Sequence, residues 1–258
     1  MLLGVCTKPE NVWIAAQAGF DYVECGLSAL HAMPEDAYQA LLKQKDAFPI
    51  PVLKCNGFMP GDVHPVGPQA REEKLRAYTE KALSRAHALG IRLAVFGSGA
   101  ARAVPAGWSH DEAWRQIVAF LKLTAEYGEK YDIDIAIEPL RRQECNILNL
   151  VSEGTAAAAV VNDRRVGVLG DTFHMRSSFE PWDALTYAGK KLKHIHISHT
   201  LPDLSKRVFP ASGDGEDYAE IFETLRAMDY PGDVSVEAGC DDLLKDGRKA
   251  VACLKPLM

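Results

Sequence analysis

The feature that most constrains the fold of this chain is an eightfold alternation between short apolar runs and helix-length amphipathic segments. Runs rich in Val, Ile and Leu, separated by segments of this length, are typical of βαβ units whose parallel sheet is buried on both faces. The eight runs expected to form strands are Leu2–Thr7, Asp21–Gly26, Val52–Phe58, Arg92–Ser98, Asp134–Leu140, Val166–Asp171, Lys193–His199 and Asp233–Gly239.

Helices are expected between these runs, and several carry recognisable end signals. Ser109 stands before Asp111 and Glu112 at one start, and Gly90 follows Leu89 at one end, as capping preferences predict. The expected helical segments are Asn11–Gly19, Glu35–Asp46, Gln69–Leu89, Ser109–Glu129, Val151–Val161, Pro181–Gly189, Glu216–Met228 and Asp241–Leu254.

The length of the chain suits a closed barrel. A (β/α)₈ barrel takes about 250 residues, and the chain has 258. An open doubly wound sheet also alternates strands and helices, but it needs a glycine-rich phosphate-binding turn after its first strand. Lys8, Pro9 and Glu10 follow the first run instead. We therefore expect one α/β domain over residues 1–258, a single (β/α)₈ TIM barrel.

Composition limits the classes of binding partner and the cellular compartment that we expect for this chain. The chain has 29 Lys and Arg against 35 Asp and Glu, a net charge of −6, and lacks the basic stripe that nucleic-acid binding requires. Its longest helical apolar stretch, Thr155–Val161, is far below the roughly 20 residues of a membrane span. The first residues do not show the basic region followed by an apolar stretch that is typical of a secretion signal. The six cysteines are scattered singly along the chain. We expect a cytoplasmic protein that binds neither nucleic acid nor membrane.

Polar residues end four successive expected strands. Glu138, Asp171, His196 and Glu237 each follow or close an apolar run, and in a barrel the carboxyl ends of the strands meet at one rim. Three hard oxygens and one imidazole suit Mn²⁺, Mg²⁺ or Co²⁺. His194 shares its strand face with His196 by alternation, so the pattern alone leaves open which of the two is the ligand.

Other strand ends are less specific. Glu24 could bind a substrate hydroxyl or pair with a neighbour on the first or third strand. Cys55 is interpreted as a packed thiol, since no histidine with a partner carboxylate is placed to activate it. The Gly97–Gly99 turn with Arg102 could cradle a phosphate, but such a short motif is weak evidence.

A phosphate is also disfavoured by charge. Barrel phosphate sites usually form after the seventh and eighth strands, where this chain has Asp214, Glu216 and Asp217. These carboxylates would repel a phosphate. The expected small-molecule substrate is therefore unphosphorylated.

Several motifs together resemble a known superfamily. The chain contains IAIEP at 135–139, DTFH at 171–174, HIHIS at 194–198, GDGEDY at 213–218 and SVEAG at 235–239. This set, covering roughly residues 134–240, resembles the xylose-isomerase-like barrels of sugar isomerases and epimerases. Within them it looks most like the ketose 3-epimerases of the tagatose and psicose type.

The resemblance implies a metal site and an acid/base pair. It assigns Glu138, Asp171, His196 and Glu237 as ligands of a divalent cation, with Mn²⁺ expected before Mg²⁺ or Co²⁺. Glu138 and Glu237 double as the catalytic acid/base pair. His196 is favoured over His194, which is then interpreted as a supporting residue within the barrel.

The resemblance also implies substrate contacts. His174 keeps the D-x-x-H spacing of a substrate ligand, and Glu144 lies six residues after Glu138, where these epimerases place a second carboxylate. Arg207 falls in the loop after the seventh strand, where a substrate-contacting arginine is expected, with Lys206 as the alternative. A homo-oligomer, dimer or tetramer, is expected.

These residues predict a metal-dependent sugar isomerase or epimerase that transfers a proton next to a carbonyl through an enediolate. A ketose 3-epimerase acting on a free sugar is the favoured activity. Hydroxypyruvate isomerisation, aldose–ketose isomerisation and inosose dehydration are alternatives on the same metal site. A non-enzymatic ligand-binding barrel is disfavoured, because buried carboxylates without a cation are costly.

Overall fold

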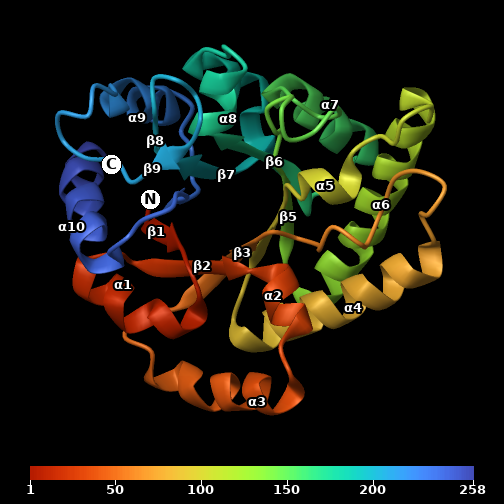
Figure 1. Ribbon diagram of the computed structural model, residues 1–258, viewed down its shortest axis with the longest axis horizontal. Coiled ribbons are helices and arrows are strands. Elements are labelled where there is room, and N and C mark those ends of the chain that lie inside the picture. The colour runs from red at the N-terminus through yellow and green to blue at the C-terminus, as the bar shows by residue number, and fades with distance from the viewer.

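The strands form a closed parallel barrel. The computed structural model describes all residues 1–258, and eight strands pair around the barrel in the order β1-β10-β7-β6-β5-β4-β3-β2 (Figure 1). Each strand overlaps one of the eight runs expected from the sequence, so the predicted (β/α)₈ architecture is confirmed. The strands are β1 Leu3–Cys6, β2 Tyr22–Gly26, β3 Val52–Asn56, β4 Leu93–Phe96, β5 Asp134–Ile137, β6 Val166–Asp171, β7 Leu192–Ile197 and β10 Val234–Val236.

Helices surround the barrel as an outer ring. Ser109 caps one of them, its hydroxyl accepting a bond from the Glu112 amide at 3.3 Å, and Gly90 ends another at φ +105°. None of the helices combines the length and the apolar character needed to cross a membrane. The seven long α-helices are α1 Val12–Ala18, α3 Glu35–Gln44, α4 Glu72–Leu89, α6 His110–Tyr131, α7 Val151–Val161, α9 Tyr218–Ala227 and α10 Leu243–Leu254.

The eighth expected helix, over 181–189, is a 3₁₀ segment instead (η3, Trp182–Tyr187). An unexpected α-helix, α8 (Thr172–Ser177), directly follows β6 and takes up part of this connection. Phe179 and Gly189, both with positive φ, interrupt helical backbone on either side of the 3₁₀ segment. Further 3₁₀ turns are η1 Pro9–Asn11, η2 Lys45–Ala47, η4 Gly189–Lys191 and η5 Lys255–Leu257.

Small elements gather at the carboxyl ends of the strands. Helix α2 (Leu27–Ala32) follows β2 and α5 (Gly99–Arg102) follows β4. A two-stranded antiparallel sheet, β8 (His199–Thr200) with β9 (Arg207–Val208), follows β7. Sequence periodicity did not indicate these elements because each is only two to six residues long.

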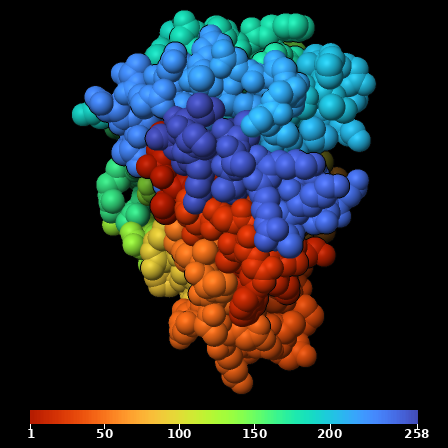
Figure 2. Space-filling model, turned by 90° about the vertical axis from the view of Figure 1, so that its left-hand side faces the viewer, coloured from red at the N-terminus to blue at the C-terminus, as the bar shows by residue number.

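The two ends of the chain close the barrel. Strand β1 pairs with β10, with Leu3 opposite Val234, and helices α1 and α10 pack together outside them. Figure 2 shows this seam, where the first residues in red lie against the last in blue. A continuous core of buried apolar side chains fills the space between strands and helices, so the rim is carried by a rigid support.

Candidate metal and catalytic site

The four strand-end residues converge on one point above the barrel. Their ligand-type atoms all lie within 4.8 Å of one another. Nδ1 of His196 lies 3.2 Å from Glu138 Oε1, 3.7 Å from Asp171 Oδ2 and 3.0 Å from Glu237 Oε2. The structure thus brings together all the residues assigned as ligands from the sequence, while their role as ligands stays a prediction.

The chemistry of this cluster fits a divalent cation. Glu138, Asp171 and His196 are 5%, 2% and 0% exposed, and carboxylates removed from water in this way need a compensating positive charge. Oε2 of Glu237 is buried, and neither His196 Nδ1 nor Arg207, at 3.0 and 2.9 Å, meets it with hydrogen-bond geometry. Three carboxylates around one imidazole nitrogen form a donor set suited to Mn²⁺ or Mg²⁺.

The Gly97–Gly99 turn makes room for Glu138. A Cβ on Gly97 would clash with the Glu138 carboxylate oxygen, at 2.2 Å. Arg102 is fully buried and donates to the carbonyl oxygens of Phe96, Glu138 and Leu148 at 2.9, 2.7 and 3.2 Å. Its guanidinium is therefore occupied in holding the backbone at Glu138, and the turn does not form a phosphate cradle.

The D-x-x-H spacing has a local explanation. Oδ1 of Asp171 accepts a bond from the His174 amide at 2.9 Å and caps α8, which leaves Oδ2 for the cluster. His174 Nδ1 accepts from the Arg141 amide at 3.3 Å, so we assign the ring proton to Nε2. That nitrogen lies 4.0 Å from Glu138 Oε1. His174 therefore presents a donor at the edge of the cluster.

The β8–β9 sheet delivers Arg207 to the same place. Its guanidinium nitrogens lie 2.6 Å from Asp171 Oδ2 and 2.9 Å from Glu237 Oε2. Lys206, the alternative left open by the sequence, lines a neighbouring cavity with Val208 and Asp246, which Arg207 also borders. Arg207 is the cation that reaches the cluster.

Glu144 is not brought to the cluster. Its side chain is 40% exposed, and Oε1 pairs with Arg141 Nε at 2.7 Å. Arg141 also donates to the Leu204 carbonyl at 2.7 Å. In this structure Glu144 helps to tie the loop after β5 to the loop between β8 and β9, and its assignment as a substrate ligand stays a prediction.

Glu24 supports the cluster from below. It is fully buried, and Oε1 accepts a bond from His196 Nε2 at 2.9 Å. Oε2 lies 2.8 Å from His194 Nε2 and accepts from Ser235 Oγ at 2.6 Å. The side chain of Glu24 therefore pairs with neighbours, as one of the two alternatives expected, but these neighbours lie on β7 and β10 and not on the first or third strand.

This arrangement separates the two histidines. His196 donates from Nε2 to Glu24, so with a cation bound its Nδ1 lone pair would face the cluster, as in carboxylate–histidine–metal arrangements. His194 lies one layer deeper, where Nδ1 donates to the Asp233 carbonyl at 3.0 Å. The preference for His196 over His194 at the cluster agrees with the structure.

Charge crowding drives the pKa values of the two glutamates apart. Burial, followed by the charge of Glu237, raises the pKa of Glu138. Burial alone would also raise the pKa of Glu237, but His196 and Arg207 outweigh it and lower that pKa well below its usual range. Burial opposes protonation of His196, yet Glu237 and Glu24 raise its pKa well above the ordinary value. Two neighbouring carboxyl groups whose pKa values are shifted in opposite directions are typical of acid/base pairs.

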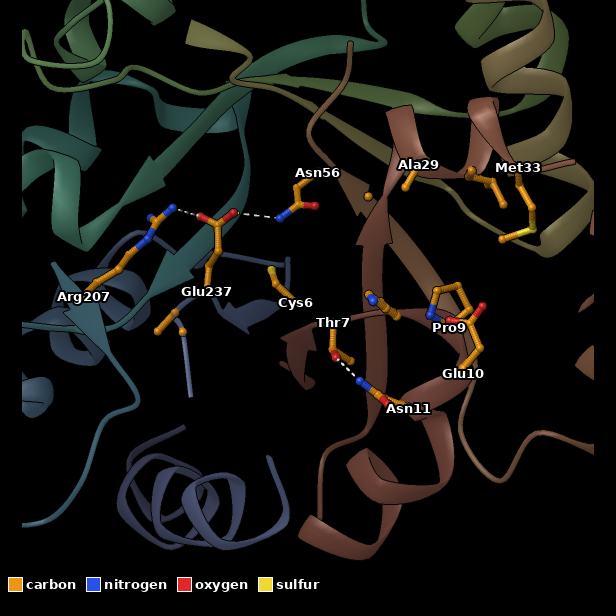
Figure 3. Close-up of a pocket in the computed structure, with 15 residues that line it drawn as sticks. Cys6, Thr7, Pro9, Glu10, Asn11, Ala29, Met33, Asn56, Arg207 and Glu237 are labelled. Atoms are coloured by element: carbon orange, nitrogen blue, oxygen red, sulfur yellow. Dashed lines mark hydrogen bonds and ion pairs between the residues drawn. The ribbon is translucent and has the colours of Figure 1, made fainter. Parts of the chain in front are cut away.

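A cavity of about 770 Å³ lies beside the cluster. Glu237 and Arg207 are at one end, and Asn56 donates to Glu237 Oε1 at 2.7 Å (Figure 3). The other end reaches Glu10 and Met33. The bond between Asn56 and Glu237 could not be predicted from spacing, because the two residues are 181 positions apart in the sequence.

Relatives of this chain are sugar epimerases by name. An L-ribulose 3-epimerase of a Methylomonas species is 25% identical over 246 residues, covering 93% of this chain and 81% of that protein. A D-psicose 3-epimerase of Agrobacterium fabrum is 34% identical over 114 residues, 44% of this chain and 37% of that protein. Several of the curated relatives are thus matched over less than half of their length.

Solved structures share the fold over the whole chain. A D-allulose 3-epimerase from a Methylomonas species superposes with a TM-score of 0.85 at 21% identity, covering 100% of this chain and 98% of that one. A 3-keto-D-glucoside 4-epimerase from E. coli gives 0.83 at 18% identity, with 99% of each chain covered. The family model described as the xylose isomerase-like TIM barrel matches residues 12–257, so the chain belongs to the xylose isomerase-like TIM barrel family.

Proposed function

We propose that this protein is a metal-dependent sugar epimerase that moves a proton on the carbon next to a carbonyl, as a ketose 3-epimerase does on a free sugar. The observation that carries the proposal is the convergence of Glu138 and Glu237 on one point from the ends of β5 and β10, which have two strands between them in the barrel. The names of the relatives, L-ribulose 3-epimerase and D-psicose 3-epimerase, support the same reaction class.

Glu138, Asp171, His196 and Glu237 would hold the divalent cation, with Mn²⁺ proposed as the ion. When bound, such an ion supplies Lewis-acid polarisation of the carbonyl, typically worth several kcal/mol. Glu24 accepts the Nε2 proton of His196 and would thereby orient Nδ1 of the ring toward the cation.

The two glutamates divide the proton transfer between them. Because they enter the site from strands separated by β6 and β7, they can reach the two faces of a substrate carbon. One removes the proton and the other returns a proton from the opposite face, which inverts the configuration. The Arg207 guanidinium and the His174 Nε2 proton lie beside them and would stabilise negative charge on the enediolate oxygens.

The experiment that tests this proposal is reaction in D₂O. Free ketoses and aldoses are incubated with the Mn²⁺-loaded protein, and the products are examined by chromatography and NMR. We expect an epimer that carries deuterium at the inverted carbon, since a carboxylic acid exchanges its proton with solvent between removal and return. A product with no label at any carbon would indicate a hydride shift and overturn the two-base proposal.

The metal is tested separately. Chelation should abolish the exchange, and Mn²⁺ should raise the melting temperature of the protein, because a ligand that binds only the folded state stabilises it. His196→Ala should bind Mn²⁺ much more weakly than the parent. Equal affinity in the two proteins would show that the site is assigned wrongly.

A further inference from the structure

The cavity is larger than the reacting centre requires. Clefts of about 300–1,000 Å³ enclose most of a drug-sized ligand, and a single hexose is smaller than such a ligand. A hexose placed at Glu237 would therefore leave a large part of the roughly 770 Å³ empty. The unfilled part, which we call the distal arm, is lined by Thr7, Lys8, Glu10, Asn11, Ala29 and Met33.

One wall of the distal arm is polar and comes from the turn after β1. Lys8 and Glu10 are exposed to the cavity and have no ion-pair partner. Asn11 donates its amide hydrogen to Thr7 Oγ1 at 2.8 Å, which fixes both side chains and leaves the amide oxygen of Asn11 without a side-chain partner. This wall therefore offers the Lys8 ammonium as a donor to sugar hydroxyl groups. The Glu10 carboxylate and the Asn11 amide oxygen are available as acceptors.

The opposite wall is apolar and comes from α2. Ala29 lies on the exposed face of that helix, and Met33 caps its end while packing partly against the core. Figure 3 shows Ala29 and Met33 across from Glu10 and Asn11, with Glu237 and Arg207 at the left of the view. A polar wall facing an apolar wall suits a sugar ring, which has hydroxyls at its edge and C–H groups on its faces.

We propose that the distal arm binds a second sugar-sized group, so that the substrate class is a keto sugar in glycosidic linkage, of disaccharide size. This rests on the proposed function, because the ring with the carbonyl must lie between Glu138 and Glu237. The second ring then extends over Asn56 toward α2 and the turn after β1, and no new reaction step is required.

The test compares substrates that differ only in the second ring. Methyl β-glucoside and cellobiose, each oxidised to a ketone at one ring carbon, are assayed with the Mn²⁺-loaded protein by deuterium exchange next to the carbonyl. We expect kcat/KM to be at least about tenfold higher for the cellobiose ketone, the usual scale for one well-used subsite contact. Equal values for the two ketones would overturn the proposal.

Paired variants locate the effect. Ala29→Trp fills the distal arm from an exposed helix position and should abolish the preference for the longer ketone. Ala40→Trp, at an exposed position on α3, is the matched control and should behave as the parent. Lys8→Ala, with Lys43→Ala as its control, repeats the test without adding bulk. A preference that persists in both Ala29→Trp and Lys8→Ala would contradict the proposal.

A binding measurement separates this inference from the reaction. Calorimetry with unoxidised cellobiose and methyl β-glucoside requires no turnover. Tighter binding of cellobiose that is lost in Ala29→Trp supports the distal arm even if no ketone exchanges deuterium, a result that would overturn the proposed function alone. Equally weak binding of both sugars overturns the distal arm, whatever the reaction.

Discussion

The two ends of the barrel use the same residue types in opposite ways. At the amino ends of the strands each carboxylate faces a cation: Asp233 lies 3.0 Å from Lys54, and Asp134 lies 2.6 Å from Lys193. At the carboxyl ends three carboxylates crowd around a single imidazole, and one cation, Arg207, is shared between two of them. Balanced pairs stabilise the fold, whereas an excess of buried negative charge creates a site for a cation and for proton transfer.

The difference predicts separable effects. Removing a charge from the carboxyl end should reduce metal binding or turnover, and removing one from the amino end should reduce only the free energy of unfolding. If a charge removed at the amino end also lowered metal affinity or turnover, the two ends would be coupled through the barrel.

The largest effect is expected for Glu237→Gln. It keeps the size of the side chain and removes the carboxylate that would transfer a proton, so kcat/KM for deuterium exchange should fall by about 10² to 10⁴, the usual worth of a general acid or base. The amide also weakens the metal site, which adds to the loss. Exchange rates measured by NMR check this prediction, and full activity in this variant would exclude the two-base mechanism.

An intermediate effect is expected for Glu24→Gln. The amide cannot hold His196 as the carboxylate does, and loss of such a supporting partner usually lowers metal affinity by about 10- to 100-fold. Mn²⁺ titration followed by electron paramagnetic resonance measures it. Ser235→Ala is the control and should have a smaller effect, because it removes the hydrogen bond to the other carboxylate oxygen, with those to Tyr22 and His194, and leaves the bond between Glu24 and His196 in place. Unchanged Mn²⁺ affinity in Glu24→Gln would show that Glu24 does not position the histidine.

The contrast between the two ends also explains how far the sequence could be interpreted. Glu138, Asp171 and Glu237 were found because each ends an apolar run, and a closed barrel converts that one-dimensional pattern into a rim. The supporting role of Glu24 depends on strand register around the barrel, which brings it to residues 170 and 172 positions away. Local patterns contain no such information.

The same limit applies to the short elements. Helix α8 and the β8–β9 sheet are too short to produce periodicity, yet they position His174 and Arg207. Glu144 was assigned by its distance along the chain from Glu138, and the loop that carries it turns its side chain toward Arg141. Offsets within irregular loops do not fix where a side chain points.

A smaller effect, on stability alone, is expected for Lys54→Met. The Lys54 side chain is 10% exposed and its ammonium donates to Asp233. Its loss should lower the free energy of unfolding by about 1.5–3 kcal/mol, the range for a hydrogen bond to a charged group. Urea denaturation measures this change. Mn²⁺ affinity and deuterium exchange should match those of the parent protein, and a loss of either would contradict the division between the two ends.

The smallest effect is expected for Lys193→Met, and it tests the division most strictly because Lys193 lies on β7, the strand that carries His196. The pair that Lys193 forms with Asp134 is partly exposed, and Arg165 lies 3.4 Å from the same carboxylate. Since a second cation remains and solvent screens the pair, the free energy of unfolding should fall by no more than about 1 kcal/mol. The side chain of Lys193 points away from the cluster by strand alternation relative to His194 and His196, so Mn²⁺ affinity should not change. A tenfold weaker Mn²⁺ affinity would mean that charge at the amino end helps to set the geometry of His196, and that the two ends of the barrel do not act separately.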